Sequence, residues 1–252
     1  AGRFLSIIDS DNIGALITST GDVTITAADT DLTGLINAGG IVSFNSTNNL
    51  NITLGDIDLS TFDLTDAELD LVTGASLIRI DSGLGAGAIK LRGNIGPDNV
   101  GSLQLVTATT IDSSGLANTI TVATLDLDAG TGIGDTIALE TAATLINADS
   151  QAGNVDIDNA ATGATVVASL TTTDGGTINF DQNGNQSLKV TTASTGGGTI
   201  TINNSGGSGA DIEVGSITDT ATVVVNAEGA IDDADDDSGA TAADITASSV
   251  DL

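Results

Sequence analysis

Apolar and polar residues alternate along most of this chain with a period of two. Val23, Ile25 and Ala27 alternate with threonines, and Leu188 and Val190 flank a lysine. A period of two places one set of side chains inside and the other in solvent, as in a β-strand. Further segments of this kind are Ile41–Phe44, Leu50–Leu59, Leu77–Ile80, Ile89–Leu91, Leu103–Val106, Ile120–Leu127, Ile178–Phe180 and Val223–Val225. No segment carries the sustained apolar stripe of a helix, so the pattern predicts an all-β chain.

The predicted strands recur at a nearly constant interval. Segments of the form Gly-x-apolar-x-apolar begin at Gly153, Gly176 and Gly198, a spacing of about 22 residues. A second strand-like series between them keeps nearly the same spacing. A unit of this length cannot close a core alone, so neighbouring units must stack. The sequence therefore predicts a right-handed parallel β-helix (β-solenoid) of about 22 residues per coil and roughly 11 coils.

Two stretches depart from this interval, residues 111–135 and residues 229–239. Each is accompanied by a similar octet, Ile120–Leu127 in the first case and Ile245–Leu252 in the second. The octets lie about 125 residues apart, so we expect a longer repeat above the coil repeat. We further expect residues 1–252 to form one continuous solenoid that is a segment of a longer repeat protein.

Composition narrows the class of function. The chain has 34 acidic and 5 basic residues, no histidine and no cysteine, and its net charge is −29. Binding of nucleic acid is not expected, because phosphate contacts require clustered lysine and arginine. Histidine- or cysteine-based nucleophilic catalysis and imidazole or thiolate metal sites are excluded by the missing residue types. No apolar run approaches the roughly 18 residues of a membrane span.

The glycine-led coils, the segment Gly132-Ile-Gly-Asp135 and the turns rich in threonine, asparagine and aspartate resemble haemagglutinin-type repeats. Such repeats belong to large secreted bacterial exoproteins and adhesins of the filamentous haemagglutinin, two-partner-secretion kind. The resemblance is clear over residues 111–252 and looser over residues 13–110. It implies a right-handed β-helix, secretion to the cell surface or beyond, and a rod-like adhesive or matrix role. The N-terminal secretion motifs of that family are not visible.

A carbohydrate-active β-helix enzyme is the first alternative. Glycoside hydrolysis needs two carboxyl groups with different pKa values at a suitable separation. Carboxylates two residues apart share the outward face of a strand, and the pairs of this kind are Asp56/Asp58, Glu68/Asp70, Asp126/Asp128 and Asp156/Asp158. The chain has no tryptophan or tyrosine to hold a sugar ring. We interpret these pairs as solvated strand faces and expect no catalysis.

A calcium-dependent binding module is the second alternative, and calcium is the one cofactor considered. Calcium takes oxygen ligands, which carboxylates and turn carbonyls supply. The candidate ligands are Asp232, Asp233, Asp235, Asp236 and Asp237. The other interpretation of this cluster is a solvated acidic loop.

Three of the five positive charges lie close together in the sequence, at Arg79, Lys90 and Arg92. Each lies between apolar neighbours and should point outward, so we hypothesise a basic spot that docks an acidic face of a neighbouring molecule. The sequence as a whole favours a structural or adhesive extracellular rod or filament segment. It would associate with itself end to end or along a filament, or continue in a longer chain. A host-surface or matrix glycan is the candidate ligand.

Overall fold

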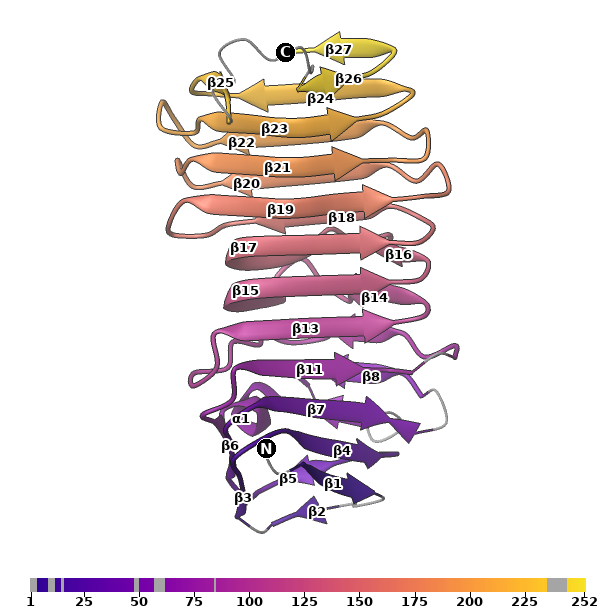
Figure 1. Cartoon of the computed structure of the whole chain (residues 1–252), viewed down its shortest axis with the longest axis vertical. Coiled ribbons are helices and arrows are strands. Elements are labelled where there is room, and N and C mark those ends of the chain that lie inside the picture. Colours follow the sequence, from indigo (N-terminus) through magenta and orange to yellow (C-terminus); the bar gives the residue numbers. More distant parts are fainter. Residues whose placement is uncertain are drawn as a thin grey trace.

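A computed structural model describes residues 4–8, 12–14, 16–47, 50–56, 62–83, 85–234 and 244–252. The chain is an all-β parallel solenoid of about 22 residues per turn and about 10 turns. The turns stack into a rod from the indigo N-terminal end to the yellow C-terminal end (Figure 1). The predicted fold class is therefore confirmed. Of the helices in the described ranges, none combines the length and the apolar character needed to cross a lipid bilayer.

The longer strands form one face of the rod, in front in Figure 1, which we call the long-strand face. Its strands are β1 (Leu5–Ile8), β4 (Val23–Ala27), β7 (Ile41–Ser46), β11 (Leu77–Asp81), β13 (Ser102–Thr107), β15 (Thr119–Ala129), β17 (Leu139–Ser150), β19 (Thr165–Thr172), β21 (Leu188–Ser194), β23 (Ile212–Thr218), β25 (Ile231–Asp233) and β26 (Ile245–Thr246). From β4 to β23, each of these strands pairs in parallel with the strand of this face in the turn before and in the turn after.

The shorter strands form a second column behind them, the short-strand face (Figure 1). These strands are β8 (Ile52–Leu54), β9 (Phe62–Leu64), β12 (Ile89–Leu91), β14 (Thr110–Ser113), β16 (Gly132–Ile133), β18 (Val155–Asn159), β20 (Ile178–Asn183), β22 (Ile200–Ser205), β24 (Thr222–Ala227) and β27 (Ser249–Asp251). The N-terminal turns add two small sheets, β3 (Ile17–Ser19) with β6 (Ile36–Ala38) and β10 (Val72–Thr73), and β2 (Asn12–Ile13) with β5 (Asp31–Leu32). They also hold the single-turn helix α1 (Asp66–Leu69).

The core runs along the rod axis between these faces. Parallel pairing in register stacks like on like, so that Leu103 lies beside Leu125 and Ile178 beside Ile200. Alternation along each strand then buries every second side chain, and these aliphatic side chains line one continuous interior. Phe180 is also fully buried there. Stacked aliphatic layers fill the interior, which explains why so few aromatic residues suffice.

The N-terminal turns are less regular than the sequence interval suggested. Val42 pairs with Ile78, so the turn between them is much longer than the others, and it contains α1. Because this turn uses more residues than the others, the chain forms about ten turns and not the roughly 11 that were expected.

The second of the two segments interpreted as departures does lengthen its turn, because Ile217 pairs with Ile245, farther along the chain than the regular interval. The first segment does not. Ile133 pairs with Ile111 on one side and with Val155 on the other, one regular turn away in each direction. The segment around Ile133 is therefore an ordinary part of its turn. The octet Ile120–Leu127 lies inside β15, whereas Ile245–Leu252 is divided between β26 and β27, which pair with different columns. The similarity of the two octets is therefore not a structural repeat.

Candidate functional site

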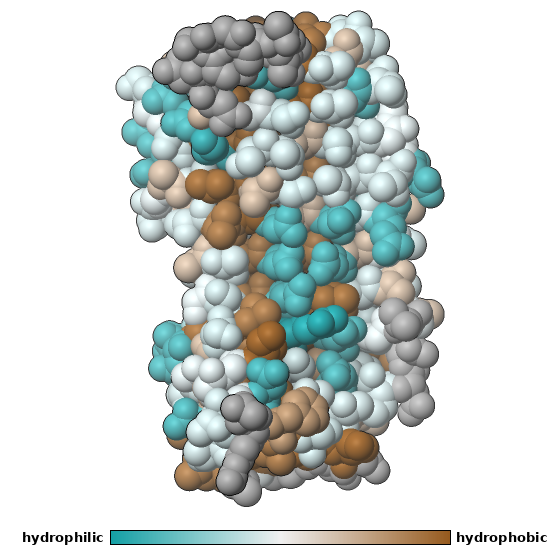
Figure 2. All heavy atoms as spheres, viewed as in Figure 1, coloured by the Kyte–Doolittle hydropathy of each residue, from teal (hydrophilic) through white to brown (hydrophobic). Residues whose placement is uncertain are grey.

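Outward side chains of four neighbouring strands, β11, β13, β15 and β17, stack in two rows along the rod. The register places Arg79, Gln104, Asp126 and Asn147 in one row, and Asp81, Val106, Asp128 and Asp149 in the next. Strands of neighbouring turns are about 4.8 Å apart, so these side chains can bond along the axis. Figure 2 shows hydrophilic residues gathered over the middle of this face.

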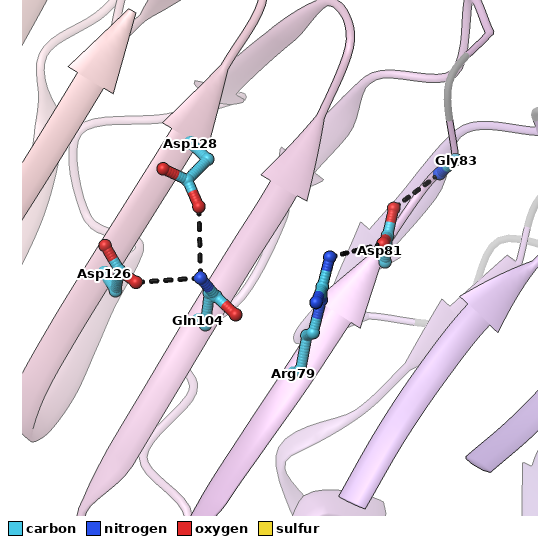
Figure 3. Close-up of polar contacts among 6 residues, drawn as sticks. All are labelled: Arg79, Asp81, Gly83, Gln104, Asp126 and Asp128. Carbon is cyan, nitrogen blue, oxygen red and sulfur yellow. Dashed lines mark hydrogen bonds and ion pairs between the residues drawn. The ribbon is translucent and has the colours of Figure 1, made fainter. Parts of the chain in front are cut away.

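Gln104 joins two carboxylates of the next turn. Its Nε2 donates to Asp126 Oδ2 at 2.8 Å and to Asp128 Oδ2 at 3.0 Å (Figure 3). From the other side, Asn147 Nδ2 donates to Asp126 Oδ1 at 2.7 Å. One amide on each flanking turn thus holds the carboxylates of β15 in place.

Arg79 is fixed by its neighbour on the same strand. Its Nη2 donates to Asp81 Oδ2 at 2.9 Å, and Asp81 Oδ1 accepts from the backbone N–H of Gly83 at 2.8 Å (Figure 3). The Arg79 side chain is 41% exposed. Its Nε is nevertheless shielded from solvent and has no hydrogen-bond partner among the described residues. A buried N–H without an acceptor is uncommon in folded proteins.

A hollow of about 380 Å³ opens between these groups. Its polar lining includes Arg79 and Asp81 from β11, Asp128 from β15 and Asp149 from β17. Small or apolar residues line the space between them, including Val106, the outward residue of β13. The hollow has a guanidinium–carboxylate pair at one end and two carboxylates at the other. Its volume lies in the range of small-molecule sites.

The carboxylates around the hollow do not have equal proton affinities. The pKa of Asp128 is raised, first because burial disfavours its charged form and then because Asp126 and Asp149 lie close. The hydrogen bond from Gln104 and the charge of Arg79 act in the opposite direction. The site therefore contains a carboxyl group that takes up a proton more readily than an isolated aspartate.

A second carboxyl stack extends from the first residues of β17 to β18 and β20 of the short-strand face. Asp158 pairs in register with Glu140 on one side and Asp181 on the other. Burial, followed by the charges of Asp181, Glu140 and Asp156 and a side-chain hydrogen bond with Asp181, raises the pKa of Asp158 to about 6. Burial also raises the pKa of Glu140. Three neighbouring strands thus place an acidic side chain at the same register position.

The predicted calcium ligands are only partly within the described residues. Asp232 and Asp233 lie on β25 and, with Asp244, line a hollow of about 330 Å³ near the C-terminal end. Asp235, Asp236 and Asp237 lie outside the described residues. Over the described ranges, no group of three or more acidic side chains is placed to hold a metal ion. The calcium site stays a prediction.

The three residues of the hypothesised basic spot are divided between the two faces. Arg79 lies on β11, which pairs with β7 and β13. Lys90 lies on β12, which pairs with β8 and β14, and Arg92 follows it. Closeness in sequence did not place these residues on one face, because the chain turns a corner between β11 and β12.

The carboxylate pairs were predicted to lie on outward strand faces, and the structure describes some of them. Asp126/Asp128 and Asp156/Asp158 point outward from β15 and β18 as expected. Asp58 lies outside the described residues.

The strand interpretation is wrong for Glu68 and Asp70, which belong to α1 and its C-cap. Glu68 accepts backbone N–H bonds from Thr65 at 2.7 Å and Leu32 at 2.8 Å. Reciprocal bonding between Thr65 and Glu68 forms a capping box that starts the helix, and this local bonding overrides the alternating pattern.

The regular spacing of the turns could have identified two neighbouring residues at the hollow, although the sequence analysis did not do so. The step from Gln104 to Asp126 is one regular turn, so aligned turns would have placed these two residues side by side. The step from Arg79 to Gln104 is longer than a regular turn, and the step from Asp128 to Asp149 is shorter. These deviations from a constant interval hide the other members.

In comparisons with protein-family models, curated proteins and solved structures, the chain matches none.

Proposed function

We propose that this chain is a rod-like structural and adhesive segment of an extracellular bacterial surface or matrix protein. One observation carries the proposal: a single 22-stranded sheet winds along the rod, with parallel pairing from turn to turn. Such pairing satisfies backbone hydrogen bonds between turns and leaves the strand faces free to present side chains. A stack of this kind can act as a spacer that presents rows of outward side chains along its length.

The resemblance to haemagglutinin-type repeats supports the same proposal. It connects a stacked coil of this length with secreted adhesins and hence with a location outside the cell. The net charge of −29 fits a solvated rod whose sides repel one another at low salt. In this proposal the rod associates with further copies, or continues in a longer chain, and binds a host-surface or matrix glycan.

The rod is tested by small-angle X-ray scattering and electron microscopy of the purified chain. About ten turns at about 4.8 Å give a stack of roughly 48 Å. We expect an elongated particle of at least that length, with longer rods as protein concentration and salt increase. A particle that remains monomeric at all concentrations and fails to adhere to glycan-coated surfaces would contradict the structural and adhesive role.

Catalysis on a glycan is a second candidate, because the hollow brings acidic groups and one arginine together. Asp128 has a raised pKa, as a general acid requires, and Asp126 or Asp149 would be its partner. The assay measures release of reducing ends from neutral and acidic polysaccharides. Loss of that release in Asp128→Asn, with release retained in Asp174→Asn, would support this candidate. No release from any substrate would exclude it over the substrates tested.

A further inference from the structure

We propose that the hollow on the long-strand face binds an uncharged sugar residue of a polysaccharide through its hydroxyl groups. This inference rests on the proposed adhesive function and names the site and the ligand class. It follows from the arrangement of donors and acceptors around one cavity.

The β11 end of the hollow supplies hydrogen-bond donors from Arg79. Arg79 is held by Asp81, which is itself held by the Gly83 N–H. The Arg79 Nε is buried without a partner among the described residues, and it belongs to a side chain that lines the hollow. The guanidinium carries five N–H donors, and because its side chain is 41% exposed, its outer N–H groups can donate to a ligand oxygen that enters the hollow.

The other end supplies acceptors. Asp128 Oδ2 accepts from Gln104 at 3.0 Å, and Asp149 Oδ1 accepts from the Thr171 hydroxyl at 2.6 Å. A carboxylate has about four acceptor positions, so each retains capacity for a ligand donor. The two carboxylates lie on adjacent turns in direct register. They can therefore receive hydrogen bonds from neighbouring hydroxyls of one sugar ring.

A hydroxyl group is both a donor and an acceptor, so it suits both ends of the hollow. Val106 and Ala108 line the hollow and offer an apolar surface to the C–H groups of the ring. The volume of about 380 Å³ is that of a small-molecule site.

Charged glycans fit the site less well. An anionic sugar would meet Asp128 and Asp149, and it would approach a chain of net charge −29. An ammonium-bearing sugar that enters through its cationic group would pair with the carboxylates, but that group has no acceptor for the Arg79 guanidinium. A neutral sugar pairs with both ends and needs no change of protonation.

The test is a screen of neutral, acidic and amino oligosaccharides on a glycan array, followed by calorimetric titration of those that bind. Three variants carry the argument. Arg79→Met removes the guanidinium donors, Val106→Lys fills the hollow and pairs with the carboxylates, and Thr218→Lys is the matched control. Val106 and Thr218 belong to the same outward row of the long-strand face, five turns apart, and the two lysine variants change the net charge equally.

We expect a neutral oligosaccharide whose Kd increases at least tenfold in Arg79→Met and Val106→Lys and changes less than twofold in Thr218→Lys. Equal weakening in Thr218→Lys would overturn the site. Binding of only amino oligosaccharides would overturn the ligand class. No binding of any neutral glycan at millimolar concentration would overturn the inference as a whole. Scattering from Val106→Lys reports on the rod separately, so loss of the glycan site and loss of the rod are distinguishable.

Discussion

Asn159 shows how individual side chains hold this solenoid at its corners. Its side chain is fully buried. Its Nδ2 donates to Gln182 Oε1 at 2.7 Å and to the Ala143 carbonyl at 3.0 Å, and it lies 3.1 Å from Thr165 Oγ1. Its Oδ1 accepts from the Ala143 N–H at 2.9 Å and from Thr141 Oγ1 at 2.8 Å. One side chain thus connects neighbouring turns through polar groups that water cannot reach.

We expect Asn159→Ala to lower the free energy of unfolding by about 3 kcal/mol, because it leaves several buried partners without hydrogen bonds. Urea unfolding followed by circular dichroism measures the change. Asn226→Ala is the control, since Asn226 is exposed and donates outside the core to Asn203. A change of about 0.5 kcal/mol or less is expected there. Similar losses in both variants would contradict a special role for the interior network.

Asp158 makes stability depend on pH. Its pKa is raised to about 6 in the folded chain, from an ordinary value of 3.8. The folded state therefore binds this proton more tightly than the unfolded state does. The resulting stabilisation is fully present below pH 3.8 and is lost as the pH rises through about 6.

We expect the Tm at pH 5 to exceed that at pH 7 by about 2–4 °C, the shift that about 1 kcal/mol produces in a chain of this size. The figure of about 1 kcal/mol is reduced for solvent screening, because Asp158 is only partly buried. Asp158→Asn should remove part of the difference, whereas Asp174→Asn, at an exposed turn, should retain it. An identical pH dependence in the two variants would show that general charge repulsion, and not this stack, causes the effect.

At the scale of the element, the turns depend on glycines where backbones of adjacent coils approach closely. Gly153 has φ +83°, and a Cβ at this residue would lie 1.9 Å from the carbonyl oxygen of Thr131 in the preceding turn. Both the left-handed backbone and the approach of the next coil exclude a side chain. The corner can close at the normal coil spacing because glycine stands there.

Gly153→Ala should therefore destabilise the chain by more than about 2 kcal/mol. Gly163→Ala is the matched control, because its nearest neighbour, the Thr144 Cγ2 atom, would be 3.9 Å from the new Cβ. Thermal unfolding of both variants measures the difference. Comparable Tm values would contradict the steric argument.

At the scale of the whole molecule, the acidic surface is the dominant property. The net charge is −29, and multivalent cations would reduce repulsion along the rod. The predicted calcium ligands Asp232 and Asp233 lie near the C-terminal end of the described chain.

We expect millimolar calcium to raise the Tm relative to chelator, and to do so by more than magnesium at the same concentration. The variant with Asp232→Asn and Asp233→Asn together should lose the calcium-specific part. An unchanged Tm between chelator and calcium would reject the calcium prediction. An equal effect of both ions would indicate screening of the whole surface.

The class of the fold follows from the amino-acid pattern alone. The alternation around Val23 and Ile178 defines which side chains are buried, and the interval between Gly153, Gly176 and Gly198 defines the turn. Both signals are local and periodic, and parallel stacking in register repeats them from turn to turn. The outward position of Asp126 and Asp128 followed from the same period.

The tertiary structure alone decided which outward residues meet. Arg79 and Asp149 line the same hollow although they are far apart in sequence, whereas Arg79 and Lys90 lie on different strand columns. The length of a turn varies, and the turn from Val42 to Ile78 is much longer than the turn that ends at Asp149. Each extra residue in a corner changes the sequence interval between the residues that pair on adjacent turns, so contacts between turns depend on corner lengths that the alternating pattern does not encode.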